Sequence, residues 1–179
     1  MTLPSFRYHP DPIRSGSIVE SGEKCRCCRE CRGHIYAGPV YSEEDLDGVI
    51  CPWCIADGSA QKIFDASFVD IEAFSDDTPE STMDEISRRT PGYNAWQSEQ
   101  WPNCCGDAMA FLTPAGIAEI REHYRELEGS LLSHIIYEMR ISGGAATRML
   151  GSLNRDAGPT AYVFRCLHCE RHHFHIDQP

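Results

Sequence analysis

The amino-acid sequence predicts an α+β fold, with zinc-knuckle or ribbon-like β elements, a helical middle segment and a C-terminal β-hairpin. Two observations lead to this prediction. Apolar stretches with strand character come first, apolar residues at helical spacing follow, and strand-like stretches return near the end. Cysteine pairs with the spacing Cys-x-x-Cys accompany the strand-like parts, and the last pair falls on the predicted hairpin. With 179 residues, the chain is expected to form a single compact, zinc-stabilised domain over residues 1–179.

The first third of the chain is expected to carry short β elements and little helix. Residues 1–24 are rich in proline and glycine and are predicted to lie as an extended arm on the core. Residues 34–41 have the apolar pattern of a strand, and residues 42–45 that of a short capped helical turn. Residues 55–64 are predicted to be helical, although Gly58 weakens that prediction.

An acidic connection is expected over about residues 65–85, because this stretch is poor in large apolar side chains. It is predicted to be exposed and to end in a helix near residues 81–89. Trp96 and Trp101 follow and are expected to pack in the core. The acidic residues that dominate the connection are Asp70, Glu72, Asp76, Asp77, Glu80, Asp84 and Glu85.

Three helices are predicted in the middle of the chain. Thr113 followed by Pro114 is a favourable helix start, because the hydroxyl can cap the helix and the missing proline N–H has no partner there. Apolar residues at helical spacing extend this first helix to about Glu128, and Gly129 is expected to break it. The other two helices are predicted over residues 131–140 and 145–153.

The predicted C-terminal hairpin pairs residues 161–164 with a return strand at residues 174–176. Aromatic and β-branched residues make both stretches typical of strands. The third cysteine pair lies between them, which places two thiols at the tip of the hairpin.

Two of the three cysteine pairs give the strongest metal signal. A tight turn between paired cysteines points both sulfurs the same way, and tetrahedral zinc needs four such ligands, so one pair recruits another. The intervening residues 29–50 number 22, slightly more than the usual 15–20, and leave room for a hairpin. We therefore predict one zinc ion held by Cys25, Cys28, Cys51 and Cys54. The residues leave this choice open, since Cys27 is adjacent and Cys28 with Cys31 forms an overlapping pair.

A second zinc site is an alternative that the sequence leaves open. The third pair, Cys166 and Cys169, needs two further ligands, and Cys105 is the favoured third ligand. Alternatively, all three cysteine pairs converge on a single ion. The candidates for the fourth ligand of the second site are Cys104, His172, His173 and His175.

Catalytic roles fit the sequence less well than binding does. Cys51-Pro52-Trp53-Cys54 has the local form of a thiol–disulfide oxidoreductase motif, but the surrounding βαβ pattern is absent and Gly58 follows closely. A zinc deaminase needs His-x-Glu before its cysteine pair, which this chain lacks. Four-cysteine zinc sites are also closed to an activated water. A non-enzymatic protein is therefore favoured.

The charge balance points to a protein partner. The chain has 16 basic and 27 acidic residues, a formal net charge of −11. Such a surface repels nucleic acid and attracts a basic protein. No apolar stretch suits a membrane span or a secretory signal, so we expect a cytoplasmic protein without membrane association. Reduced cytosolic thiols bind metal more often than they form disulfides.

Several longer sequence motifs of this chain occur together in one known family. They are Phe6-Arg7-Tyr8-His9-Pro10-Asp11-Pro12, Gly38-Pro39-Val40-Tyr41, Cys51-Pro52-Trp53-Cys54-Ile55-Ala56-Asp57-Gly58, Arg89-Thr90-Pro91-Gly92-Tyr93, Cys105-Gly106-Asp107-Ala108 and Phe164-Arg165-Cys166-Leu167-His168-Cys169. In these motifs the chain resembles the CbrC family of bacterial proteins, which carry three Cys-x-x-Cys motifs. The resemblance favours Cys25 and Cys28 as ligands, while Arg29 stands where the family pattern leads us to expect glycine.

The CbrC family is linked by name to tolerance of a colicin, a bacterial protein toxin. The resemblance therefore implies a role in tolerance or immunity, and many toxin domains that act on nucleic acid are basic. We expect a zinc-binding, non-enzymatic protein-interaction module that binds a basic partner such as a toxin domain. The alternative is a cytosolic thiol–disulfide oxidoreductase that uses Cys51 and Cys54.

Overall fold

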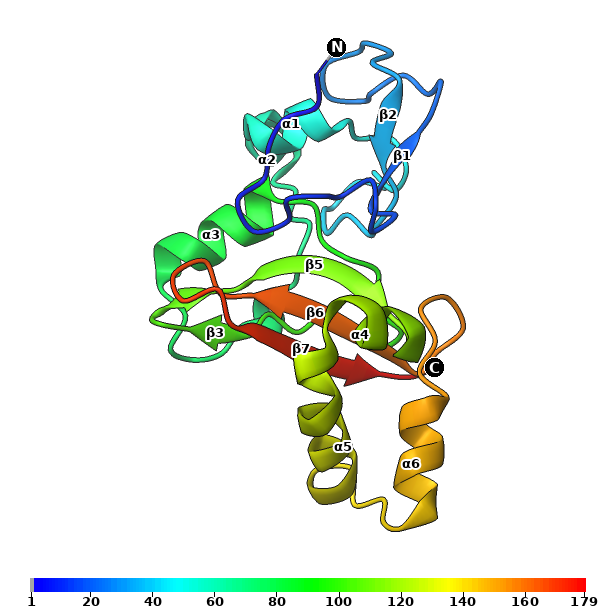
Figure 1. Ribbon diagram of the computed structural model, residues 1–179. Coiled ribbons are helices and arrows are strands. Elements are labelled where there is room, and N and C mark those ends of the chain that lie inside the picture. The colour runs from blue at the N-terminus through cyan, green and yellow to red at the C-terminus, as the bar shows by residue number, and fades with distance from the viewer. Residues whose placement is uncertain (1) are drawn as a thin grey trace.

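The computed structural model describes residues 2–179 and confirms the mixed α+β architecture, with small antiparallel sheets and the helices in the middle of the chain (Figure 1). In its N-terminal part, strand β1 (Ile18–Glu20) pairs antiparallel with β2 (His34–Tyr36), so that Ile18 lies opposite Tyr36. Helices α1 (Pro52–Ala56) and α2 (Ser59–Phe64) lie beside this hairpin. The extended arm expected over residues 1–24 therefore includes one strand.

Three local predictions for this part need correction. The strand expected over residues 34–41 ends at Tyr36, before Gly38 and Pro39, which weaken strand pairing. Residues 42–44 form bends rather than a helical turn, and residue 45 has no regular structure. The helix expected over residues 55–64 is split into α1 and α2, because Gly58 adopts a left-handed conformation with φ of 76°.

The acidic connection expected over residues 65–85 exposes most of its charged side chains, while several of its apolar side chains are buried and Ile71 is exposed. It contains a short 3-10 helix, η1 (Ile71–Ala73), and leads into helix α3 (Glu80–Arg89). Phe68 and Val69 are buried in the core, where they pack against different groups of apolar residues. These two side chains tie the segment to the molecule, while its carboxylates face the solvent.

A three-stranded antiparallel sheet with the order β5-β6-β7 forms the centre of the molecule. Its strands are β5 (Ala110–Ala115), β6 (Thr160–Arg165) and β7 (His172–Asp177). Phe164 on the central strand lies opposite Phe111 on one side and His173 on the other. The β6–β7 pair is the predicted C-terminal hairpin. A two-stranded ladder of β3 (Asn103–Cys104) and β4 (Asp107–Ala108) precedes the sheet.

The helix predicted to start at Thr113 and Pro114 is wrong at its start, because both residues belong to strand β5. Proline is tolerated there since β5 is an edge strand. Helix α4 (Ile117–His123) begins later, and the Glu119 carboxylate accepts a hydrogen bond of 2.9 Å from the backbone N–H of Gly116. Hydroxyl and proline signals thus mark the end of the strand here, not the helix start.

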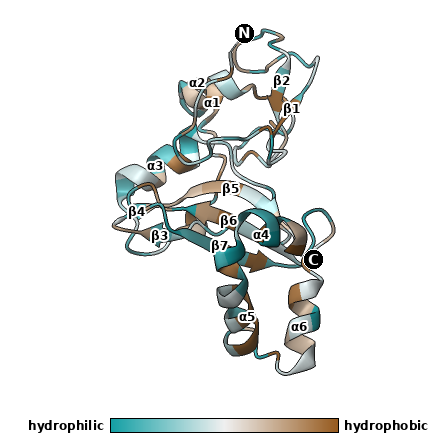
Figure 2. Ribbon diagram, in the orientation of Figure 1, coloured by the Kyte–Doolittle hydropathy of each residue, from teal (hydrophilic) through white to brown (hydrophobic). Residues whose placement is uncertain are grey.

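The remaining helices are η2 (Arg125–Leu127), α5 (Glu128–Tyr137) and α6 (Gly144–Gly151). Gly129 does not break a helix but lies in the first turn of α5; the break falls at Tyr124, whose φ is −136°. Helices α5 and α6 project together below the sheet in Figure 1. Their apolar side chains pack with one face of the sheet, and Figure 2 shows hydrophobic residues on both helices. None of the helices within residues 2–179 has the length and apolar character that crossing a bilayer requires.

An aromatic core fills the other face of the sheet. The rings of Tyr93 and Phe111 are stacked, with centroids 4.3 Å apart. Trp101 is 1% exposed, and its indole N–H donates to the backbone oxygen of Met109 at 2.7 Å. Trp96, which was also expected in the core, is 40% exposed. Alternate residues of β6 thus contact the aromatic core and the helical layer, so both faces of the sheet are covered.

Replacing Phe164 by alanine should lower the free energy of unfolding by about 3–5 kcal/mol, because the ring is fully buried between strands and aromatic neighbours. Urea unfolding of the zinc-loaded protein measures the change. The matched control, Tyr137→Ala, removes a ring that is 75% exposed and should change stability by less than about 0.5 kcal/mol. Equal losses in both variants would contradict this description of the core.

Candidate metal centres

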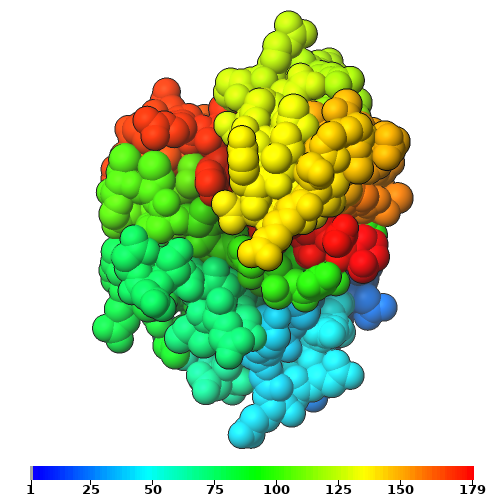
Figure 3. Space-filling model, turned by 90° about the horizontal axis from the view of Figure 1, so that it is seen from below, coloured from blue at the N-terminus to red at the C-terminus, as the bar shows by residue number. Residues whose placement is uncertain are grey.

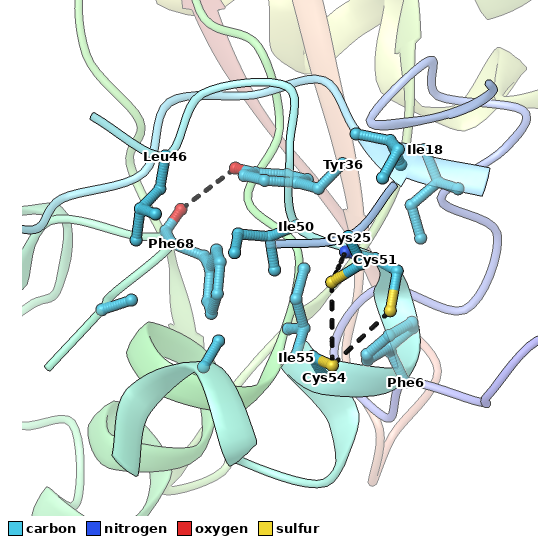
Figure 4. Packing of buried hydrophobic residues seen from close by; sticks show 13 residues of the cluster. Phe6, Ile18, Cys25, Tyr36, Leu46, Ile50, Cys51, Cys54, Ile55 and Phe68 are labelled. Atoms are coloured by element: carbon cyan, nitrogen blue, oxygen red, sulfur yellow. Dashed lines mark hydrogen bonds between the residues drawn. The ribbon is translucent and has the colours of Figure 1, made fainter. Parts of the chain in front are cut away.

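The structure brings the first four predicted cysteines together. The sulfurs of Cys25, Cys28, Cys51 and Cys54 all lie within 4.8 Å of one another. Cys25 and Cys51 are fully buried, Cys54 nearly so, and Cys28 is half-buried. Figure 4 shows Cys25, Cys51 and Cys54 at the edge of an apolar cluster, with Phe6, Ile18 and Ile55 nearby. We call these four residues the inner centre.

The first cysteine pair lies in a tight turn, the first knuckle, at the end of the β1–β2 hairpin. The Cys25 N–H donates to the Glu30 oxygen at 2.9 Å, and the Arg29 N–H donates to the Cys25 oxygen at 2.9 Å. Arg29 has a φ of 64°, in the left-handed region where glycine is usual. The resemblance led us to expect glycine at this position. Arg29 adopts the left-handed conformation that glycine would favour there.

The second pair lies at the start of α1. Cys51 precedes the helix, and Pro52 occupies its first turn, where the missing N–H costs nothing. The Cys51 N–H donates to the Cys25 sulfur at 3.3 Å, so the backbone itself joins the two pairs. Cys27 and Cys31, the other candidates, lie outside this group; the Cys31 thiol donates to the Gly22 oxygen at 3.2 Å instead.

The sulfur separations of the inner centre suit a tetrahedral ion. Four sulfurs bonded to one zinc at about 2.3 Å lie about 3.8 Å from each other. The observed separations are 3.9 Å between Cys25 and Cys54, 3.8 Å between Cys28 and Cys51, and 3.6 Å between Cys51 and Cys54. A disulfide would need about 2.05 Å. The four thiols are thus arranged as metal ligands, not as bonded pairs.

The pKa shifts of the inner cysteines also indicate that these thiols are metal ligands. Hydrogen bonds from the thiols of Cys51 and Cys54 hold the pKa of Cys25 far below its ordinary value. The contact with Cys25 raises the pKa of Cys51 to about 12 and raises that of Cys54 further, because each would place a second negative charge beside the first. Four thiolates can coexist here only when a cation compensates their charge.

The third pair belongs to a second group of four cysteines, which we call the outer centre. The sulfurs of Cys104, Cys105, Cys166 and Cys169 all lie within 4.8 Å of one another. Cys104 is 3.8 Å from Cys105 and 3.7 Å from Cys169, again close to the tetrahedral value. Cys166 is buried, whereas Cys105 and Cys169 are exposed.

The second knuckle, at the tip of the β6–β7 hairpin, repeats the hydrogen bonds of the first. The Cys166 N–H donates to the Arg171 oxygen at 2.9 Å, and the Glu170 N–H donates to the Cys166 oxygen at 3.1 Å. Glu170 has a φ of 58°, the counterpart of Arg29. Desolvation opposes ionisation of Cys166, but the backbone N–H groups of Cys169 and His168 donate to its sulfur and lower its pKa to about 6.

The two remaining ligands of the outer centre come from the β3–β4 turn. Cys104 ends β3, and Cys105 follows with a φ of 55°, which turns adjacent sulfurs toward the same point. Sequence reasoning named Cys105 and left the fourth ligand open among one cysteine and three histidines. The geometry selects Cys104. His172 instead contacts the Glu126 carboxylate at 2.7 Å, and His173 and His175 lie farther along β7.

A buried carboxylate next to the outer centre is a feature that sequence reasoning missed. Asp107 accepts hydrogen bonds from Arg7 at 2.8 Å, Tyr8 at 2.9 Å and Thr82 at 3.1 Å. His168, between the cysteines of the second knuckle, contacts it at 3.2 Å. Although burial opposes ionisation, the hydrogen bonds from Tyr8, His168 and Thr82 lower the pKa of Asp107. The carboxylate thereby joins the N-terminal arm, α3 and the second knuckle.

Two zinc ions per chain are expected in the purified, reduced protein, because each centre supplies four sulfurs at tetrahedral spacing. Cys28→Ser and Cys104→Ser should each reduce the content to one ion. Cys31→Ser, which removes a thiol outside both groups, should leave it unchanged. Elemental analysis measures the metal-to-chain ratio. A ratio of one in the unaltered protein would contradict the assignment of two centres.

A chelator should extract the two ions at different rates. The outer centre has two exposed cysteines, whereas three of the four inner cysteines are buried, so the outer ion should leave first. A colorimetric chelator would follow the release over time. Cys104→Ser should abolish the fast phase and Cys28→Ser the slow phase. The reverse assignment, or a single phase, would show that burial does not control release.

Comparison with known proteins places this chain among bacterial relatives. A family model described as "Uncharacterised protein family (UPF0167)" matches residues 3–178. UPF0167 proteins of Mycobacterium bovis and Mycobacterium tuberculosis are each 44% identical to the chain over 176 residues, which cover 98% of the chain and 93% of each relative. A UPF0167 protein of Pseudomonas aeruginosa is 40% identical over 177 residues, covering 98% of the chain and 97% of the relative. No solved structure matches the chain. The chain belongs to the UPF0167 family.

Proposed function

We propose that the protein is a cytoplasmic, non-enzymatic interaction module that two zinc ions stabilise and that binds a basic protein. The observation that carries this proposal is the pair of four-cysteine centres in an acidic chain of net charge −11. Four thiolates complete the tetrahedral shell of zinc, so no position is left for a water or a substrate. Metal at such centres serves stability, and structural zinc contributes about 10–16 kcal/mol of apparent binding free energy.

Burial argues against the alternative, a thiol–disulfide oxidoreductase that uses Cys51 and Cys54. A nucleophilic cysteine needs an exposed sulfur and a lowered pKa. Here Cys51 is fully buried, Cys54 is 2% exposed, and contact with Cys25 raises the pKa of Cys51 to about 12. The local motif, a cysteine before a helix with Pro52 in its first turn, is therefore better suited to holding a metal than to exchanging a disulfide.

The acidic surface supplies the proposed contact. Carboxylates between η1 and α3 and in the first half of α3 are exposed, and exposed carboxylates steer a basic partner toward the surface and speed association. The resemblance to the CbrC family, with its link to colicin tolerance, makes a basic toxin domain the proposed partner. Binding would cover the nucleic-acid-binding surface of such a domain. The contact residues proposed are Asp76, Asp77, Glu80 and Asp84.

Charge reversal tests the proposed contact. The zinc-loaded protein is titrated with the basic cytotoxic domain of a nuclease colicin at low salt. Changing Asp76, Asp77, Glu80 and Asp84 to lysine should slow association about tenfold or more, because steering depends on local charge. The control reverses four exposed carboxylates elsewhere, so that the change in net charge is the same: Glu20, Glu23, Glu43 and Glu138.

The control variant should associate faster than the contact variant, and added salt should reduce the difference. Equal rates for the two variants would remove the segment from the proposal. Absence of binding by the unaltered protein, together with unchanged killing of cells that produce it, would reject the toxin as partner.

A further inference from the structure

A cleft of about 620 Å³ lies apart from both metal centres, and its size is typical of small-molecule sites. Its lining comes from Tyr41, residues 70 and 72–75, residues 97–102, helix α5 and strand β7. Figure 3 shows teal and green segments of the chain on the same face as the yellow helix α5 and part of the red C-terminal segment. Neither the zinc centres nor the proposed basic-protein contact uses this cleft.

The cleft contains a buried carboxyl group with one oxygen that has no hydrogen-bond partner among the described residues. Glu99 accepts a hydrogen bond of 2.7 Å from the Tyr93 N–H through Oε1. Its Oε2 is buried and has no hydrogen-bond partner within residues 2–179. Gly92 makes room for this group, since a Cβ there would lie 2.5 Å from Glu99 Oε1. Burying a carboxyl without full hydrogen bonding is unfavourable, which suggests a missing partner. Asp70 and Glu72 also line the cleft.

The rest of the lining adds aromatic and histidine rings. Tyr41 and Phe74 line the cleft together with His134, His173 and His175. Desolvation lowers the pKa values of His173 and His175, so both are neutral at neutral pH. No lysine or arginine is among the lining residues in the part of the chain that the structure describes. The cleft is therefore unsuited to anions.

A bare metal ion does not fit the cleft either. Over the described residues, the groups of at least three His, Cys, Asp or Glu ligands that lie close enough to share an ion are the two cysteine centres. A carboxyl beside aromatic faces is instead the combination that binds ammonium and guanidinium groups, through an ion pair and cation–π contact.

We propose that this cleft binds an organic cation, with the Glu99 carboxylate as the ion-pair partner of its ammonium or guanidinium group. Asp70 adds negative charge to the cleft, and the rings of Tyr41 and Phe74, which are exposed or partly exposed, contact the aliphatic or planar part. The cation can be a free small molecule or a lysine or arginine side chain of another protein, because both offer the same chemistry.

Protonation of Glu99 gives the proposal a pH dependence. Burial, with a further contribution from Asp70, raises the pKa of Glu99 to about 8 despite the hydrogen bond from Tyr93. Near neutral pH the carboxyl is therefore protonated in the free protein, and a bound cation favours its ionised form. Binding should release a proton, and affinity should rise as pH increases toward and through about 8. Besides Asp70, the titratable groups of the lining are Tyr41, Glu72, His134, His173 and His175, and Tyr36 and Tyr93 lie near Glu99.

The test is a calorimetric titration of the zinc-loaded full chain with agmatine, which carries both a guanidinium and an ammonium group. Saturable binding is expected, with proton release measured in buffers of different ionisation enthalpy. Glu99→Gln keeps the acceptor for the Tyr93 N–H but removes the charge, and should weaken binding about tenfold or more. The matched control Glu43→Gln, at an exposed carboxylate outside the cleft, should bind as the unaltered protein does.

A second arm separates the two sources of the cation. If a blocked Gly-Arg-Gly peptide binds at least as tightly as agmatine, the ligand is a side chain of a protein; if only agmatine binds, it is a free molecule. Absence of saturable binding by both probes, or equal affinity for the Glu99→Gln variant, would overturn the proposal. Both zinc centres and the acidic contact segment are intact in these variants, so failure here leaves the proposed function unaffected.

Discussion

Mutual repulsion among clustered thiolates is the constraint on which the rest of this structure depends. In each centre four sulfurs approach to the spacing of a coordination shell, yet the first thiolate to form raises the pKa of its neighbours. A divalent cation removes that conflict, and the free energy it supplies rivals the total stability of a domain of this size. The inner centre is also part of the core packing, because Cys25, Cys51 and Cys54 belong to an apolar cluster.

The two centres connect parts of the chain that lie apart in the sequence. The inner centre joins the first knuckle to the start of α1, and the Cys51 N–H adds a direct bond between the pairs. The outer centre joins the β3–β4 turn to the tip of the central sheet. Asp107 extends that junction to the N-terminal arm and to α3 through Arg7 and Thr82. Helices α5 and α6, by contrast, are held mainly by apolar packing, with an ion pair between Glu128 of α5 and Arg121 of α4.

Sequence reasoning succeeded where a feature is encoded locally. The Cys-x-x-Cys spacing indicates pairs whose sulfurs the structure brings together, although it left Cys27 and Cys31 open as alternatives, and the alternating residues of β6 and β7 specify a hairpin. Sequence reasoning failed where contacts between distant parts of the chain determine the local structure. Thr113 and Pro114 carry signals that suit a helix start and an edge strand equally well, and only pairing with β6 distinguishes them. Cys104 could not be separated from three histidines because the sheet, not the spacing, brings it to Cys169. The burial of Glu99 has no sequence signal, since the residues that enclose it come from distant segments.

The two centres differ in how much of the chain each one spans. All four inner ligands fall within residues 25–54, whereas the outer ligands are spread over residues 104–169. Because a chain emerges from the ribosome N-terminus first, the inner cluster can capture its ion while most of the protein is still being translated. The outer cluster lacks half of its ligands until Cys166 and Cys169 have been synthesised. The inner set of ligands is therefore complete long before the outer set, and a chain truncated before Cys166 would still carry all four inner cysteines.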